Sequence, residues 1–374
     1  MKKGGGAERV VLNLINGFNT NKHTALLLNF YDRKNSFAVH CKNYNLKEKD
    51  SKLFFLKILK LIKRAREIKK ICEKEEIAVI ISFLEDANFP CLISKILFGN
   101  KCKLIISTHN DPTTKPLIYK ILIKTIYNKA SKIISVSRGI EQSLIKTFNI
   151  RKNLITTIYN PLDLNSIFKK EKSLIPKELS LLLKSNNFKF ISIGRLAEQK
   201  NHFSTIESFE KILKKYPNTE LLIIGDGPQK RALQEIIQKR NLGKKIHLLG
   251  FHKNPFPFLK SSDCFILNSK YEGFGIVITE ALACNLPVIS SDCDFGPREI
   301  LCENIKVFNS KLIKRCTNGL LVPVNDPNSL AEAMETIIKD NELRNEYKKT
   351  ARARAFDFDI KNIIKKWEDL IENV

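Results

Sequence analysis

The stretch "NSKYEGFGIVITEALACNLPVI", residues 268–289, decides the fold. An apolar run leads into a loop that contains Gly273 and Gly275. An apolar helical pattern follows, and then a second apolar run. Strand, loop, helix and strand in this order form the repeating unit of a parallel sheet covered by helices. Glu272 and Glu280 stand eight positions apart across the loop. Two carboxylates in this setting either perform acid–base chemistry or hold a ligand.

The same rhythm runs through both halves of the chain and predicts an α/β fold with one parallel sheet in each half. In the first half, we expect strands at 77–84, 102–108 and 132–137. In the second half, we expect strands at 188–194, 219–227, 245–250, 263–269 and 286–292, separated by helices near 202–216, 228–241, 255–261 and 276–284. The predicted organisation is a first domain at 1–160, a connection at 161–187, a second domain at 188–350, and a closing helical segment at 351–374 that packs back on the first domain.

The beginning of the first domain departs from the pattern of a parallel α/β unit. Such a domain begins with an apolar strand that leads into a glycine turn, whereas here the glycines of "GGGAERVVLNLINGF" begin at position 4. We therefore expect a first sheet that lacks one central strand and exposes apolar surface. An inactive chain remains an alternative for this reason.

Composition limits the class of protein and its partners. The 374 residues are 43% hydrophobic, and no apolar run approaches the roughly 20 residues of a membrane span. No signal peptide is visible.

The nine cysteines form no C-x-x-C pair, which favours buried reduced thiols in a cytosolic protein. Residues 1–150 hold 28 Lys/Arg against 12 Asp/Glu, and residues 201–374 hold 26 against 23. The basic first half favours a polyanionic partner, although the Lys- and Asn-rich composition is an alternative cause.

Three glycine-containing segments are candidates for holding a phosphate. Arg195 and Lys200, in "IGRLAEQKNH", follow the strand expected at 188–194, and strand ends are where open α/β sheets bind ligands. Their guanidinium and ammonium groups suit a diphosphate. The other two segments place Gly225 and Gly227, and Gly5 and Gly6, in turns before helices. Solvated surface cations and ordinary tight turns are the alternatives.

Four segments resemble one known family. "EGFGIVITE" looks like the E-x7-E motif of retaining glycosyltransferases of family 4, and "GRLAEQKN", "GGAERV" and "IYNPLDL" resemble other motifs of that family. The resemblance implies the GT-B architecture, in which two Rossmann-like domains face each other across a cleft. By this likeness Arg195 and Lys200 bind the diphosphate of a UDP-sugar and Glu280 binds its ribose. Glu272 and the backbone of Gly273, Phe274 and Gly275 meet the transferred sugar, and His109 reaches that sugar from the first domain.

The expected reaction is transfer with retention and without a metal ion or other cofactor. Two D-x-D strings, Asp292–Asp294 and Asp357–Asp359, do not adjoin a candidate nucleotide loop of the metal-using kind. Retaining glycosidases need two carboxyl groups about 5–5.5 Å apart at the scissile bond. Here both glutamates lie on the donor side, so we expect them to hold the donor while the acceptor attacks from the face of the leaving group.

The segment "SKLFFLKILKLIKRAREIKK", residues 51–70, carries eight Lys/Arg and a single acid. We expect its cations to contact an anionic membrane surface and a polyprenyl-diphosphate-linked saccharide acceptor: Lys60, Lys63, Arg64 and Lys69. The expected location is the cytoplasmic face of the inner membrane, and the expected role is assembly of a lipid-linked or surface glycan such as lipopolysaccharide or capsule. For this segment, a core-facing helix with a solvated basic face is the alternative.

For the whole protein, the alternative functions are a nucleotide-sugar 2-epimerase and a non-catalytic polyanion-binding protein. No nucleic-acid-binding module is visible.

Overall fold

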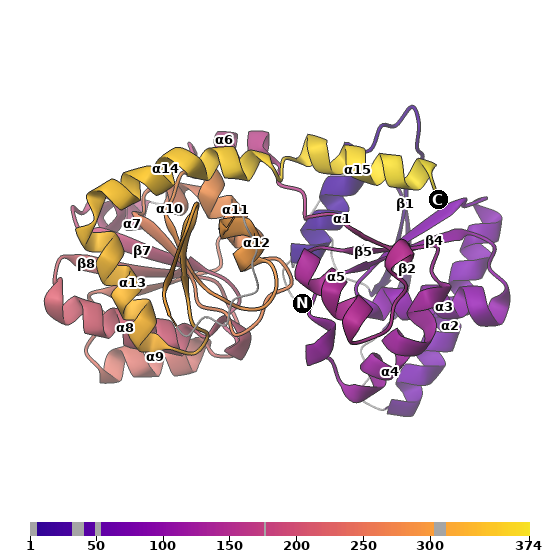
Figure 1. Cartoon of the computed structure of the whole chain (residues 1–374), viewed down its shortest axis with the longest axis horizontal. Helices are drawn as coiled ribbons and strands as arrows, with labels where there is room; N and C mark the ends of the chain where they lie inside the picture. Colours follow the sequence, from indigo (N-terminus) through magenta and orange to yellow (C-terminus); the bar gives the residue numbers. More distant parts are fainter. Residues whose placement is uncertain (1–5, 32–40, 49–53, 176, 303–311) are drawn as a thin grey trace. The chain divides into compact units, whose positions relative to one another are not determined.

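The protein is seen in a computed structural model that describes residues 6–31, 41–48, 54–175, 177–302 and 312–374 (Figure 1). The chain divides into two compact units. The first unit consists of Met1–Pro161 together with Ile360–Val374, and the second is Leu162–Asp359. Each unit is an α/β structure built on parallel strands. Nowhere in the described ranges is a helix long and apolar enough to cross a membrane.

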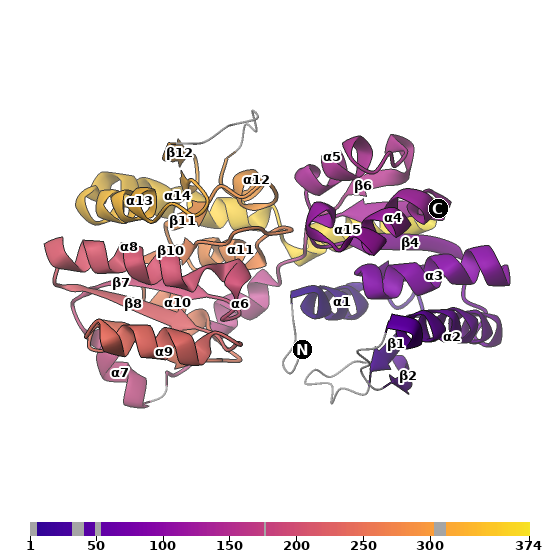
Figure 2. The same cartoon turned by 90° about the horizontal axis from the view of Figure 1, so that it is seen from below.

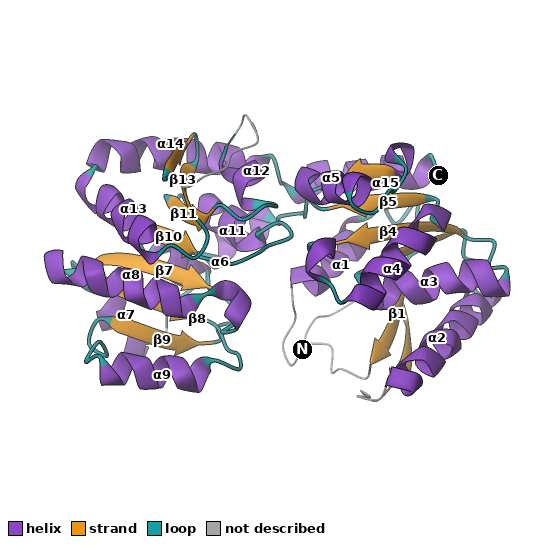
Figure 3. Cartoon of the chain, turned by 60° about the horizontal axis from the view of Figure 1, so that its bottom comes forward, coloured by secondary structure: helices purple, strands orange, loops and turns teal. Residues whose placement is uncertain are grey.

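The first unit contains two sheets among its described residues. Strands β3 (Val79–Phe83), β4 (Lys103–Thr108), β5 (Lys132–Ser135) and β6 (Ile155–Thr157) form a four-stranded parallel sheet. Strands β1 (Leu26–Tyr31) and β2 (Lys42–Glu48) form a separate parallel pair (Figure 3). Every residue of β1 is only half-buried, whereas β4 is buried after its first residue. Among the described residues, no strand pairing joins these two sheets.

The helices of the first unit are α1 (Gly6–Gly17), α2 (Phe54–Lys74), α3 (Glu85–Phe98), α4 (Leu117–Ile126), α5 (Arg138–Lys146) and α15 (Ile360–Glu372). Helix α2 packs on α3, and α3 contacts α4, so the three follow one another along one side of the unit (Figure 2). Helix α15 packs on α1, where the missing side chain of Gly17 makes room for Ile364. Trp367 of α15 is buried, and its ring lies 5.9 Å from that of Phe83.

The second unit has one sheet with the strand order β12-β13-β11-β10-β7-β8-β9. All neighbouring strands are parallel except β12 and β13. The strands are β7 (Phe188–Ile193), β8 (Thr219–Ile224), β9 (Ile246–Gly250), β10 (Cys264–Leu267), β11 (Val288–Ser291), β12 (Lys314–Cys316) and β13 (Gly319–Val322). The helices that follow or flank them are α8 (His202–Lys215), α9 (Lys230–Lys239), α10 (Phe256–Lys260), α11 (Ile276–Ala283), α12 (Pro297–Leu301), α13 (Pro327–Lys339) and α14 (Asn341–Phe356). Strands β8 and β10 are buried along their whole length, as expected of continuous apolar runs between two helical layers.

Two expected boundaries differ from the structure. The region 161–187, expected to be a connection, contains helices α6 (Leu164–Lys170) and α7 (Lys177–Lys184) and belongs to the second unit. The closing segment 351–374 is two helices, because α14 ends at Phe356 and α15 begins at Ile360. Only the second of these helices belongs to the first unit.

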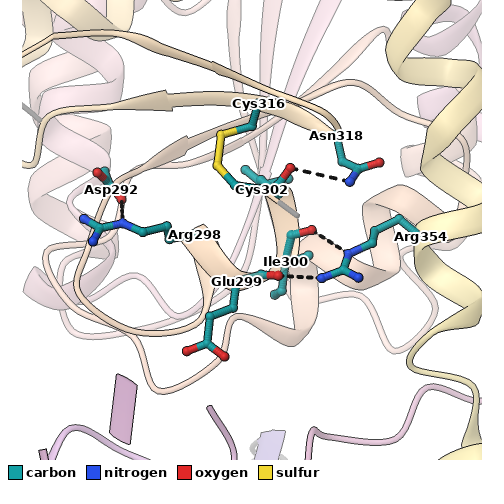
Figure 4. Close-up of a disulfide and its surroundings, with 9 residues drawn as sticks. Asp292, Arg298, Glu299, Ile300, Cys302, Cys316, Asn318 and Arg354 are labelled. Carbon is teal, nitrogen blue, oxygen red and sulfur yellow. Dashed lines mark hydrogen bonds and ion pairs between the residues drawn. A yellow bond between two sulfur atoms is a disulfide. The ribbon is translucent and has the colours of Figure 1, made fainter. Parts of the chain in front are cut away.

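The expectation that all cysteines are reduced thiols is wrong for one pair. Cys302 and Cys316 form a disulfide, with their Cα atoms 4.9 Å apart (Figure 4). This bond ties the end of α12 to the edge strand β12. The other seven cysteines are free. The pairing joins positions 14 residues apart in sequence, a spacing that carries no disulfide signature.

Candidate functional site

The strand order of the second unit marks one place for a ligand. The chain runs from β7 outward through β8 and β9, and then returns to the other side of β7 with β10. Cys264 of β10 pairs with Phe190 of β7. Open α/β sheets bind ligands at such a reversal, beyond the carboxyl ends of the two central strands. The loops that follow β7 and β10 meet at this point, and they contain six of the residues selected from the sequence: Arg195, Lys200, Glu272, Gly273, Phe274 and Gly275.

Lys200 and Glu272 come together across these two loops. The Lys200 Nζ atom lies 2.5 Å from Oε1 of Glu272, and Ser269 Oγ donates a hydrogen bond of 2.6 Å to the same oxygen. Glu272 is buried, with 7% of its surface exposed. Ser291, at the end of β11, donates to the carbonyl of Ser269. The carboxylate is therefore held by an ammonium and a hydroxyl, and the ammonium is fixed at the end of β7.

One backbone and one side-chain hydrogen bond hold the two loops against each other. The Lys270 N–H donates to the Gln199 carbonyl at 2.8 Å, and Gln199 Nε2 donates to the Tyr271 carbonyl at the same distance. Sequence reasoning missed Ser269, Ser291 and Gln199. Ser269 and Ser291 lie at or just beyond strand ends, and that position is the signal that could have identified them.

The glycines after β8 let the neighbouring loop approach closely. A Cβ atom on Gly225 would collide with the carbonyl oxygen of Gly194, and one on Gly227 would collide with the backbone of Leu196. The Leu196 N–H donates to the Asp226 carbonyl at 3.0 Å. This contact positions the loop that begins with Arg195, whose side chain is exposed.

The loop after β10 leads into α11 through a left-handed residue. Gly275 is the N-cap of α11 with φ +91°, a conformation that favours glycine. Gly273 and Phe274 precede it, and both are buried. The Phe274 ring packs edge-on against Phe358 at 5.4 Å, which gives it a packing role. Glu280 lies in the second turn of α11 and is only 1% exposed.

One acid of each D-x-D string is paired with an arginine. Asp292 Oδ1 accepts a hydrogen bond of 2.7 Å from Arg298 Nε (Figure 4), and Asp357 pairs with Arg354 at 2.6 Å. Arg354 also donates to the carbonyls of Glu299 and Ile300 and so holds α12. Across the described ranges of the chain, no group of three or more His, Cys, Asp or Glu side chains is arranged to hold a metal ion.

His109 belongs to the first unit and follows β4. Its Nε2 lies 3.0 Å from Ser107 Oγ, and its ring is 5.5 Å from that of Phe83. Desolvation lowers the pKa of His109 from 6.5 to about 4, so the imidazole is neutral at pH 7. The glycine turn expected to hold a phosphate in this unit is described only in part. Gly6 is the first residue of α1, and Gly5 lies outside the described residues.

The four cations of the basic helix α2 that were expected to contact a membrane or an acceptor differ in their surroundings. Arg64 is buried, bonds Glu48 at 2.7 Å and Tyr31 at 3.0 Å, and stacks on Phe30. It is therefore a structural cation, and its assignment to the membrane or acceptor surface is wrong. Lys69 pairs with Glu73 at 3.4 Å, and Lys63 is exposed. Lys60 is half-buried.

Known proteins resemble the chain along nearly its whole length. Residues 4–166 match the family described as Glycosyltransferase Family 4, and residues 177–354 match Glycosyl transferases group 1. An uncharacterized glycosyltransferase of Methanocaldococcus jannaschii is 35% identical over 88% of this chain and 87% of its own. The N-acetylgalactosamine-N,N'-diacetylbacillosaminyl-diphospho-undecaprenol 4-alpha-N-acetylgalactosaminyltransferase of Campylobacter jejuni is 32% identical over 95% of this chain and 93% of its own.

Solved structures with the same fold are more distant in sequence. Anabaena Alr3699/HepE in complex with UDP-glucose superposes with a TM-score of 0.81 at 20% identity and covers 100% of this chain and 98% of its own. The sucrose-phosphate synthase of Thermosynechococcus elongatus gives 0.78 at 18% identity, with 99% and 93% coverage. These likenesses show the GT-B fold of two Rossmann-like domains.

Proposed function

Because the chain belongs to the glycosyltransferases of family 4, we propose that it moves a hexose or N-acetylhexosamine from a UDP-sugar to a lipid-linked saccharide, with retention at the anomeric carbon. The observation that carries the proposal is the meeting of Lys200 and Glu272 at the strand reversal of the second unit. An ammonium and a carboxylate at that point match the two halves of the donor: the diphosphate is anionic, and the sugar offers hydroxyl groups.

Lys200 and Arg195 are assigned to the diphosphate. Positive charge placed where the leaving group gains negative charge stabilises the transition state. Two cations supply this charge from the protein itself, and one aspartate of each D-x-D string, Asp292 or Asp357, is paired with an arginine. We therefore expect transfer to proceed without a divalent metal ion or other cofactor.

Glu272 is assigned to the donor sugar, and its surroundings disfavour a nucleophilic role. Its Oε1 already accepts from Lys200 and Ser269, which leaves Oε2 to accept from sugar hydroxyls. The N-terminus of α11 follows the left-handed Gly275 with no side-chain cap, so its amide groups suit an anionic or hydroxyl oxygen. Glu280 is assigned to the ribose, and His109 to the sugar as a neutral hydrogen-bonding group, both on the strength of the family resemblance.

The acceptor class is suggested by the relatives. Two Campylobacter jejuni relatives, 32% and 26% identical, are named as N-acetylgalactosaminyltransferases that act on undecaprenol-linked saccharides. The excess of basic residues in the first half of this chain suits a diphosphate-linked lipid at an anionic membrane surface. We place the protein on the cytoplasmic face of that membrane, in the assembly of a lipid-linked oligosaccharide, O-antigen or capsule.

The test is transfer to a polyprenyl-diphosphate-linked saccharide from a panel of UDP-sugars. Mass spectrometry identifies the product, and NMR identifies its anomeric configuration. Lys200→Ala should lower kcat/KM about 100-fold or more, because it removes a charge that acts on the leaving group. Lys211→Ala is the matched control, because the contacts of Lys211 with Glu207 and Asn328 are exposed. The assignment fails if Lys200→Ala and Arg195→Ala both match the control. Release of a free epimerised sugar without acceptor would instead identify a 2-epimerase.

A further inference from the structure

Helix α4 carries a stripe of apolar side chains that are exposed among the residues that the structure describes. Leu117 is 72% exposed, Ile121 48% and Ile118 43%. At 100° per residue these three positions fall within one sector of the helix, and Ile123 on the opposite side is fully buried. Single exposed apolar residues are ordinary, but three on one face of a ten-residue helix make a continuous patch.

Lysines border this stripe. Lys120 and Lys124 lie three and seven positions after Leu117 and so flank the stripe on one side, and "LIYKILIKTI" contains no acid. The nearby carboxylates are already engaged. Glu85 pairs with Lys115 at 2.7 Å, and Asp86 accepts a hydrogen bond from Tyr119. The outward face of α4 is therefore apolar with a cationic border.

The inner face of α4 is held firmly. The Tyr119 ring packs edge-on against Phe89 at 5.2 Å, and Tyr119 Oη donates to Asp86 on α3. Because these contacts fix the helix from beneath, the exposed leucine and isoleucines belong to an ordered surface. Contact of these apolar side chains with water is unfavourable. An ordered apolar patch of this kind is typical of a surface that binds a partner.

We propose that α4 docks on an anionic membrane, with Leu117, Ile118 and Ile121 entering the interface and Lys120 and Lys124 meeting lipid phosphates. Helices with an apolar face and a lysine border bind anionic bilayers in this orientation. A second copy of the chain fits less well. Three side chains offer far less than the roughly 800 Å² per partner of a stable interface, and two copies would oppose like charges. The proposal rests on the lipid-linked acceptor proposed above, and it moves the docking surface away from α2, where Arg64 is buried and Lys69 is paired.

The test is co-sedimentation of the full chain with phosphatidylglycerol/phosphatidylethanolamine vesicles and with phosphatidylcholine vesicles. Wild type should bind the anionic vesicles preferentially. The variant Leu117→Gln/Ile118→Gln/Ile121→Gln should partition about tenfold or more weakly, because glutamine keeps helix propensity but removes the apolar contact. Leu174→Gln/Leu181→Gln is the matched control, since these leucines are 98% and 81% exposed in the second unit. Lys120→Glu/Lys124→Glu should abolish the preference for anionic lipid, and it serves as the second probe if the triple variant does not fold.

Unchanged vesicle binding of the folded triple variant overturns the proposal. So does a dimer that the triple variant dissociates while vesicle binding stays the same, because the stripe would then belong to a second copy. Transfer to a short-chain, water-soluble acceptor separates this surface from the proposed function. The triple variant should keep that activity within about twofold, since α4 acts on the membrane and not on the donor. Vesicle binding through α4 by a wild type that transfers no sugar would support the surface and refute the function.

Discussion

Replacing Gly225 with alanine should destabilise the second unit and weaken nucleotide binding together. The new Cβ would meet the carbonyl oxygen of Gly194, a backbone atom that cannot rotate away, and φ at Gly225 is +155°. Relief requires the ends of β7 and β8 to separate. Because Gly194 immediately precedes Arg195, the displacement falls on the loop proposed to hold the diphosphate.

The expected size follows from two contributions. Backbone strain at an unfavourable φ costs about 1–3 kcal/mol, and forcing extra atoms into a packed region costs about 1–3 kcal/mol. The free energy of unfolding should therefore fall by about 2–6 kcal/mol, and for a unit of this size the melting temperature should fall by about 4–24 °C.

Thermal unfolding and UDP titration measure both effects. Gly243→Ala is the matched control, because a Cβ on Gly243 would meet no atom within 4 Å. Its stability should stay within about 0.5 kcal/mol of wild type. If Gly225→Ala has the same melting temperature as Gly243→Ala and binds UDP as tightly, then the loops after β7 and β8 do not approach each other as described. The argument for the diphosphate site would then be wrong.

Three further outcomes are expected. Burial, and then the charge of Lys200, lower the pKa of His202 from 6.5 to about 4, so the unfolded state binds the proton more readily than the folded state. The free energy of unfolding should therefore fall by up to about 3 kcal/mol as the pH falls from 6.5 to 4. Urea titrations of the variant His202→Leu should lack this part of the fall. Thiol labelling of the denatured, unreduced protein should modify seven of the nine cysteines, and reduction should destabilise the second unit by up to about 3 kcal/mol; labelling of all nine would show that Cys302 and Cys316 are not joined. Transfer should continue in EDTA at an unchanged rate, whereas activity restored only by added Mn²⁺ or Mg²⁺ would contradict the assignment of the leaving-group charge to Lys200 and Arg195.

The sequence predicted five of the seven described strands of the second unit, β7 to β11, because they are mostly continuous buried apolar runs, and it missed β12 and β13. Runs such as "CFIL" need no partner to be identified, since continuous apolar stretches between glycine turns have few other structures. Strand β2, "KNYNLKE", was missed because its side chains are polar and half-exposed. Its strand character comes from pairing with β1, which no local pattern encodes.

The candidate site residues were selected one by one and not as a set of contacts. Lys200 and Glu272 were selected for different parts of a ligand, and their pairing, 72 positions apart, depends on the order of strands in the sheet. Arg64 was misplaced for a similar reason. It follows the exposed Lys63 in sequence, while its actual partner Glu48 comes from β2, a strand that was not foreseen.

The two units differ in when they become complete during synthesis. Leu162–Asp359 is a single continuous stretch, so its core is available as soon as the ribosome has passed it. The first unit is completed after the second, because Trp367, packed beside Phe83, follows Leu162–Asp359 in the sequence. A fragment cut after Pro161 would lack this tryptophan, so isolating that half intact requires a circular permutation that joins α15 directly to it.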